Sequence, residues 1–408
     1  MHFQIVTEDN PDMVETLKRH KQMIKQSLDA FPPDTLADTL ADHEKILTKQ
    51  FQKQLSTKAY QEQLQLIEII KHHGVPVRMM VEDKGHVVVE HEGSLQKAHF
   101  EYFTDQIFAS DTGQYYDKDG VLHFIPASFK NAQRQGEERL AIAQAENFGA
   151  IIQPLKAKTG KTITFEGGDI RQMIGKKLFF IGQGHRSDPL TAQAIADASG
   201  YFVLPIQLLQ AQFYHLDCCF LPLPNDAALL YEGDYVLNEH GNITLDEQGW
   251  PVIIPGTETM TATSRELIRM IYPSEKLVLI SKDEALAFAT NAVVLQNPIT
   301  NKFKLFVNGK RDETIDELTA LKMQTISLTK AHIQHIDAVS NGVMDLIEVP
   351  YSTMHGSGGS IRCTVLELAC SSAALTPLLA LLDSVAKTFK NRHGSKSATL
   401  SYGTGMKE

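Results

Sequence analysis

The stretch TMHGSGGSIRCTVLEL, residues 353–368, joins a run of small residues to a lone cysteine and then to an apolar, β-branched segment. Glycine lets a backbone approach a ligand closely and adopt turns that other residues resist. Cys363 is therefore either a core thiol at the start of a strand or a nucleophile presented to a ligand. Taken alone, the segment favours the buried, inert thiol, so the rest of the sequence decides between the two.

The composition of the chain excludes several classes of function. Its 408 residues are enough for one large core or two ordinary ones, and 43% hydrophobic and 22% charged residues are typical of a globular protein. The formal net charge of −10 argues against a nucleic-acid partner, because phosphate binding needs clustered Lys and Arg. No apolar run has the length of a membrane span, so no membrane partner is expected.

The N-terminus and the cysteines bear on the compartment. The N-terminus lacks the charged start and the apolar segment of a signal peptide. The four cysteines include adjacent Cys218 and Cys219 and no CxxC pair, which favours a reducing compartment without structural zinc. The sequence thus predicts a soluble, cytoplasmic protein, although export without a cleaved signal would leave no trace in it.

The character of the chain changes near residue 76. Residues 1–75 are expected to form an N-terminal helical region, because apolar positions recur there at roughly helical spacing. Residues 76–390 alternate short β-rich runs such as KLFFIG with helix-like runs, which indicates an α/β domain. This domain carries a Gly-, Asp- and Asn-rich, hairpin-like insertion at about 232–262. The polar tail, 391–408, is expected to be flexible.

Three further segments place polar groups at the edge of an apolar β element. FASDTGQYY carries Asp111 at a turn, and ITFEGGDI carries Glu166 and Asp169 around two glycines. FYHLDCCFLPL carries His215 and Asp217, which project to one face if the segment is an extended strand. A buried His and carboxylate need partners, since an unpaired buried charge is costly.

Each segment alone has an ordinary structural explanation: a turn, a glycine bulge or a hydrogen-bonded pair. Together, carboxylates, a histidine and a thiol suit a planar cation that is attacked at carbon. A guanidinium offers N–H forks that match carboxylates, and its charge offsets their mutual repulsion. A guanidino compound is therefore the expected small-molecule substrate.

The order EGGD, HLD and GSGGSIRC resembles the guanidino-group-modifying enzymes of the pentein superfamily. These include arginine deiminases and dihydrolases, dimethylarginine dimethylaminohydrolases, agmatine deiminases and amidinotransferases. The matching segments run from about Phe108 to Leu368. The resemblance implies an α/β fold, a five-bladed propeller of ββαβ units with the active site in its central channel, here with an N-terminal helical extension.

The resemblance also implies a role for individual residues. Cys363 matches the nucleophile, and His215 matches the general acid and base. Glu166 matches the acid that orients this histidine and helps to hold the substrate. Asp111 and Asp217 match the carboxylates that bind the guanidinium nitrogens.

Further candidates for substrate contact are Arg186, Arg134 and Asp169. Arg186 follows the KLFFIG run, where relatives carry an arginine that often meets the α-carboxylate of the substrate. Arg134 resembles another recurring arginine more loosely. Asn291 matches a position that is commonly Asn and is interpreted as structural. No metal or organic cofactor is implied.

The sequence also departs from the patterns of the individual families. Arginine deiminases usually have an arginine before the first Asp, where this chain has Ser110, and an inserted helical bundle that the interval between Asp111 and Glu166 lacks. Dimethylarginine hydrolases generally lack an Asp after the His, so Asp217 favours the arginine-type deiminases. Amidinotransferases tend to have Asp where Glu166 stands.

The expected function is that of a cysteine hydrolase acting on arginine or a derivative. A covalent S-alkylthiouronium intermediate would lead to a ureido product such as citrulline, plus ammonia or an amine. Two alternatives stay open: an amidinotransferase that passes the amidino group to an amine, and a non-catalytic pentein that binds an arginine-like ligand. A homo-oligomer, or a protein partner bound through the N-terminal helices or the 232–262 insertion, is compatible with the sequence.

Overall fold

The computed structural model describes most of the region that carries the motifs. The described residues are 58–77, 107–157, 159–309, 328–351 and 359–367, with the backbone alone of a hairpin at 86–91 and 94–99. The expected helices before residue 58, part of the glycine-rich segment and the expected flexible tail at 391–408 lie outside the described residues.

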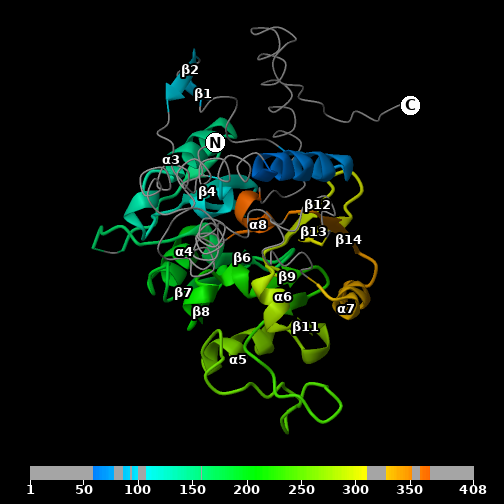
Figure 1. Ribbon diagram of the computed structural model, residues 1–408. Coiled ribbons are helices and arrows are strands. Elements are labelled where there is room, and N and C mark those ends of the chain that lie inside the picture. Colours follow the sequence, from blue (N-terminus) through cyan, green and yellow to red (C-terminus); the bar gives the residue numbers. More distant parts are fainter. Residues whose placement is uncertain are drawn as a thin grey trace, which may run out of the picture.

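Four three-stranded sheets follow one another along the described chain, and all four are built in the same order. The first two strands of each sheet pair antiparallel, and the third pairs in parallel with the second. A parallel partner requires a crossover connection, and in each unit a helix lies in that connection. Figure 1 shows these units arranged in succession around the molecule.

The four units have the following bounds. They are β3 (Gly113–Lys118), β4 (Val121–Pro126), α3 (Glu138–Asn147) and β5 (Ile151–Ile152); β6 (Ile170–Gln172), β7 (Leu178–Gln183), α4 (Thr191–Ser199) and β8 (Phe202–Gln207); β9 (Phe220–Leu223), β10 (Ala227–Leu230), α5 (Ala262–Ile271) and β11 (Leu277–Leu279); β12 (Val293–Gln296), β13 (Phe303–Asn308), α7 (Lys330–Ser340) and β14 (Met344–Val349).

The α/β fold of ββαβ units predicted from the sequence is thereby confirmed, with four units in the described ranges. A fifth unit would have to include residues outside those ranges. A helix at 58–72 precedes these units in the sequence. Its Leu66 and Ile70 belong to one core cluster with Phe306 and Tyr351. The remaining elements are β1 (His86–His91), β2 (Ser94–His99), α6 (Lys282–Leu286) and α8 (Ile361–Thr364).

Local sequence explains where several helices begin and end. The side chains of Thr261 and Thr329 accept hydrogen bonds from the first-turn amides of α5 and α7. Ser281 and Glu284 form a reciprocal capping box at the start of α6. Gly200 ends α4 in the left-handed conformation at φ 73°, which glycine adopts without the steric cost that a Cβ brings.

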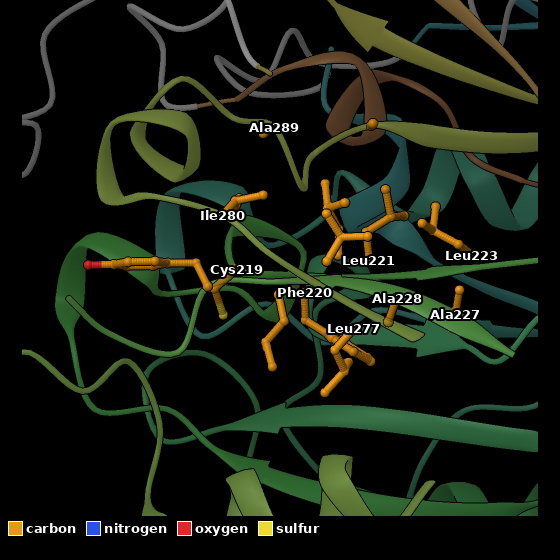
Figure 2. Packing of buried hydrophobic residues seen from close by; sticks show 14 of the residues in the cluster. Cys219, Phe220, Leu221, Leu223, Ala227, Ala228, Leu277, Ile280 and Ala289 are labelled. Carbon is orange, nitrogen blue, oxygen red and sulfur yellow. The ribbon is translucent and has the colours of Figure 1, made fainter. Parts of the chain in front are cut away.

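The largest core cluster surrounds the third unit. All residues of β9 and β10 are buried, which explains why their sequences are continuous apolar runs rather than alternating ones. Figure 2 shows Phe220 and Leu277 together on one side of β9 and Leu221 on the other side, all within this cluster. β9, the first strand of this unit, directly follows the HLD motif, and its burial fixes the position of that motif.

The segment at about 232–262 connects β10 to α5. Three isolated antiparallel bridges run through it, Tyr235 with Ile253, Leu237 with Ile243, and Leu245 with Pro251. This pairing gives the segment the hairpin-like form that its composition predicts. In Figure 1 it extends away from the body of the molecule, below α5.

Candidate active site

The candidate residues lie on short turns that precede the first strand of successive units. Asp111 lies in the 3-10 helix η2 (Ala109–Thr112), directly before β3. Glu166 is the N-cap of η4 (Gly167–Asp169), directly before β6. His215 is the N-cap of η6 (Leu216–Cys218), before β9. Equivalent turns of repeated units meet around a common centre, so the topology gathers residues that are distant in sequence.

One local expectation is wrong. The sequence of the HLDCCF segment predicts an extended strand with His215 and Asp217 on one face, but residues Leu216–Cys218 form a 3-10 helix and β9 starts at Phe220. The apolar run FLPL forms strand β9, which begins only after this turn. The two polar residues are therefore brought together by the turn and not by strand alternation.

Cys363 lies in the short helix α8, and Asn291 holds it in position through hydrogen bonds. The thiol is 4% exposed, and Asn291 Nδ2 donates a hydrogen bond to Sγ at 3.1 Å. Asn291 Oδ1 accepts from the Cys363 backbone N–H at 3.2 Å, and its carbonyl accepts from Arg362 N at 3.0 Å. Asn291, which the sequence indicated only as a structural residue, thus fixes both the backbone and the sulfur of Cys363.

His215 and Glu166 form a buried, ionised pair. His215 Nε2 lies 2.9 Å from Glu166 Oε2, and Nδ1 lies 3.8 Å from Asp111 Oδ1. Burial lowers the pKa of His215, but Asp111 and Glu166 outweigh it and raise the pKa to about 9. Burial raises the pKa of Glu166, but the hydrogen bond and charge of His215 outweigh it and bring the pKa to about 2.

Asp217 and Cys363 lie next to each other in the buried site. Cys363 Sγ lies 3.9 Å from Asp217 Oδ2, and Asp217 is completely buried. Burial raises the pKa of Asp217, with a further contribution from Asp111. Burial also raises the pKa of the Cys363 thiol, and the charges of Asp217 and Asp111 raise it further. The thiol is therefore neutral at physiological pH.

The two carboxylate oxygens of Asp111 have different surroundings. Asp111 Oδ2 accepts a hydrogen bond from Arg134 Nη1 at 2.8 Å, and the same guanidinium donates to Glu137 at 2.8 Å. Asp111 Oδ1 is buried, has no hydrogen-bond partner among the described residues and points toward His215. The structure therefore places Arg134 behind Asp111, as a partner that holds this carboxylate.

Asp169 links three turns. Its Oδ2 accepts hydrogen bonds from Ser187 N at 3.1 Å and Ser187 Oγ at 2.7 Å, and its Oδ1 accepts from Leu216 N at 3.2 Å. Burial raises the pKa of Asp169 to about 7, while the charge of His215 and the Ser187 hydrogen bond act in the opposite direction. Both carboxylate oxygens are thus engaged with protein groups.

Arg186 lies at the edge of the cluster and remains partly accessible. Its Nη1 is 3.7 Å from Glu166 Oε2, and its guanidinium lies over the Tyr214 ring at 4.7 Å. The side chain is 26% exposed. A partly exposed cation at this place is suited to meet an anionic group at the far end of a substrate.

The two glycines of EGGD are required by close packing. A Cβ at Gly168 would collide with His215 Nδ1 and lie 2.8 Å from Asp111 Oδ1. A Cβ at Gly167 would collide with the carbonyl oxygens of Ser110 and Gly113. The motif therefore lets turn η4 approach the candidate histidine without a side chain between them.

Two features are absent from the part of the chain that the structure describes. No group of three or more His, Cys, Asp or Glu side chains there is arranged to hold a metal ion. None of the helices there is both long and apolar enough to cross a membrane.

Comparison with known proteins gives several similar sequences. An uncharacterized protein of Caenorhabditis elegans is 24% identical over 273 residues, which cover 64% of this chain and 77% of that protein. The bifunctional arginine dihydrolase/ornithine cyclodeaminase AgrE of Nostoc is 23% identical over 304 residues, which cover 74% of this chain but only 32% of AgrE.

Solved structures show the same fold. The N-terminal domain of ArgZ, an arginine dihydrolase from cyanobacteria, superposes with a TM-score of 0.54 at 20% identity, covering 77% of this chain and 87% of that domain. The family of eukaryotic N,N dimethylarginine dimethylhydrolases matches residues 32–370, well over half of the sequence. The chain therefore belongs to this family, and with it to the pentein superfamily of guanidino-modifying enzymes.

Proposed function

We propose that this protein is a cysteine hydrolase that breaks a C–N bond of an arginine-like guanidinium and releases a ureido product. The observation that carries the proposal is the convergence of a thiol, a histidine and several carboxylates on one buried site, from turns of successive units. Membership of the dimethylarginine dimethylhydrolase family and similarity to arginine dihydrolases support the same chemistry.

The substrate would bind between two carboxylates. Within the described part of the chain, Asp111 Oδ1 has no hydrogen-bond partner, and the contact of Asp217 Oδ2 is the long one to Cys363 Sγ at 3.9 Å. A guanidinium that donates N–H groups to both would form charge-assisted hydrogen bonds. Its central carbon would then lie beside the sulfur. Arg134 keeps Asp111 in place for this contact through its 2.8 Å hydrogen bond.

Binding of the cation would also activate the thiol. The pKa of Cys363 is raised by burial and by the charges of Asp217 and Asp111, and a bound guanidinium would offset those charges. His215 is already protonated below pH 9, so it is unsuited to take the thiol proton. The proton would pass to solvent as the substrate arrives, leaving a thiolate with a protonated His215 nearby.

The chemistry would then run in two halves. The thiolate attacks the guanidinium carbon, and the C–N bond to the leaving nitrogen breaks as His215 donates a proton to that nitrogen. The neutral His215 next takes a proton from a water that attacks the same carbon of the S-alkylthiouronium. The C–S bond breaks as the remaining hydroxyl proton passes to the departing sulfur, so the oxygen becomes the ureido carbonyl and Cys363 is released as the thiol.

The remaining candidates would act from outside the reacting atoms. Glu166 would hold the charged form of His215 through the 2.9 Å contact. Asp169 would position η4 and η6 relative to each other. Arg186 would bind the α-carboxylate of an amino-acid substrate from the edge of the site. Substrates with this carboxylate, such as arginine or N-methylated arginine, are therefore proposed before agmatine.

The test is direct. Purified protein is incubated with L-arginine, N,N-dimethylarginine, agmatine and an arginine-containing peptide, and the ureido product and released amine are measured. Turnover of one compound that is lost in Cys363→Ala, with folding unchanged by circular dichroism, would support the hydrolase and identify its substrate class. Product formed only when glycine or another amine is added would indicate amidino transfer. Absence of both reactions would overturn the proposal and leave a binding protein.

A further inference from the structure

A second polar space lies among the first strands of the four units. Its enclosed part has a volume of about 20 Å³, which is room for about one water-sized molecule or small ion. Its walls include Gln114 of β3, Arg171 of β6, Leu221 of β9 and Val294 of β12. Because every unit contributes its first strand, the space lies where the units meet. None of the five candidate catalytic residues lines it.

Two buried arginines face this cavity. Arg171 is 5% exposed, and no protein hydrogen-bond acceptor lies within bonding distance of its guanidinium in the described part of the chain. Arg362 is 1% exposed; its Nη1 donates to the Val365 carbonyl at 2.9 Å, but no described residue accepts a hydrogen bond from its buried Nε. Such donors are costly to bury without an acceptor.

The lining of the cavity contains more positive than negative side chains. Glu367 is the acidic residue among the lining residues, and its Oε1 lies 4.0 Å from Arg362 Nε, beyond hydrogen-bond distance. The other polar lining side chains, Gln114 and Gln172, are neutral. Asp217 acts electrostatically on both arginines, but it is not a lining residue. Burial, and then the charge of Arg362, lowers the pKa of Arg171 to about 10, while Glu367 and Asp217 act in the opposite direction.

We propose that this cavity binds a small monovalent anion, held by Arg171 and Arg362. One anion would accept the hydrogen bonds that Arg171 and Arg362 Nε lack within the described part of the chain, and charge assistance would favour it over a neutral acceptor. The site is distinct from the proposed substrate site, which would bind a cation between Asp111 and Asp217. The two sites are coupled, because both cavity arginines act electrostatically on Asp217.

The experiment measures anion binding to the full-length protein without substrate. Chloride is titrated as the sodium salt, with sodium gluconate holding the ionic strength constant, and binding is followed by ³⁵Cl line broadening and by the melting temperature. Formate and phosphate then compete with chloride, to show whether a carboxylate or an oxyanion of higher charge is preferred. The wild type is expected to give a saturable chloride signal that gluconate does not give.

Three variants test the assignment in opposite directions. Arg171→Gln is expected to weaken chloride binding at least tenfold. Glu367→Gln, which removes the competing carboxylate, is expected to tighten it. Arg139→Gln removes an exposed arginine of α3 outside the cavity and is the matched control, with an unchanged dissociation constant.

Several results would overturn the proposal. These are the absence of saturable chloride binding to the wild type, equal affinity in Arg171→Gln and the wild type, or weaker binding in Glu367→Gln. If Arg171→Gln fails to fold, Glu367→Gln decides, since the Glu367 side chain is 31% exposed and its replacement leaves the core packing in place. Both readouts report binding and do not depend on the proposed catalytic reaction.

Discussion

Replacing Glu166 by glutamine tests the electrostatic centre of the site. The substitution keeps the size of the side chain and an oxygen that can accept a hydrogen bond, but it removes the negative charge 2.9 Å from His215 Nε2. The His215 side chain is buried, and burial alone lowers its pKa. Its high pKa therefore depends on the neighbouring carboxylates, of which Glu166 is the one in hydrogen-bond contact.

The size of the effect follows from the shift in the wild type. The His215 pKa is raised from 6.5 to about 9, and Asp111, at 3.8 Å from Nδ1, remains in Glu166→Gln. We expect the pKa to fall by at least about one unit, which corresponds to about 1.4 kcal/mol. A raised pKa of the folded state contributes stability that is present below pH 6.5 and lost as the pH rises through 9. The variant should therefore lose less stability across this window.

The assay is an NMR titration of the imidazole nitrogens between pH 5 and 10, combined with urea unfolding at several pH values. Glu284→Gln is a matched control, because Glu284 Oε1 makes a comparable 2.7 Å contact with His332 Nδ1 in another part of the fold. This control should leave the pKa of His215 unchanged. Once a substrate is known, the alkaline limb of kcat should move to lower pH in Glu166→Gln, since a neutral His215 is no general acid.

The reasoning would be refuted by a His215 pKa that stays near 9 in Glu166→Gln. An equal drop of the His215 pKa in the Glu284→Gln control would refute it as well, because the shift would then arise from a general change in the fold. A normal pKa in the wild type would show that the buried pair is neutral.

Three further substitutions probe the packing of the site. Gly168→Ala inserts a methyl group against His215 and should reduce kcat about a hundredfold with a stability loss of ~1–3 kcal/mol, checked by kinetics and urea unfolding; activity near the wild type would contradict the contact. Asn291→Ala should slow turnover and shift the pH dependence of Cys363 alkylation by iodoacetamide upward, whereas an unchanged profile would show that the 3.1 Å contact does not act on the thiol. Asp169→Asn should lower stability by about 1–3 kcal/mol in urea unfolding, because its amide must face a donor, and no loss would argue against the linking role.

The sequence predicts the residues of the site better than their local structure. The order of the motifs indicates Asp111, Glu166, His215 and Cys363 as one cluster, and the structure brings these side chains together. The 3-10 helix at Leu216–Cys218 escapes prediction, because an apolar run beside HLD has the composition of a strand. A short turn leaves no periodicity in the sequence that could distinguish it from the strand that follows.

The repetition of the ββαβ unit is also not recognisable in the amino-acid sequence. The four units share topology, but their first strands contain only three to six residues and differ in composition, from IRQ in β6 to FLPL in β9. Strand pairing depends on backbone hydrogen bonds and burial, so unlike sequences give the same unit. The fixed positions of Arg134 and Asp169, each satisfied by protein partners, likewise depend on contacts that only the folded chain brings together.

The electrostatics of the site explain why its composition indicates a cationic substrate. Asp111, Glu166 and Asp217 are all buried; Asp111 pairs with Arg134 and Glu166 with His215, but Asp217 makes no ion pair within the described part of the chain. Burial, and then the charge of Asp111, raises the pKa of Asp217, and burial with the charges of Asp217 and Asp111 raises the pKa of the Cys363 thiol. Under the proposed function, a guanidinium bound between the two aspartates would lower both pKa values at once. The charge that would select the substrate would then also be the charge that keeps the thiol protonated until the substrate binds.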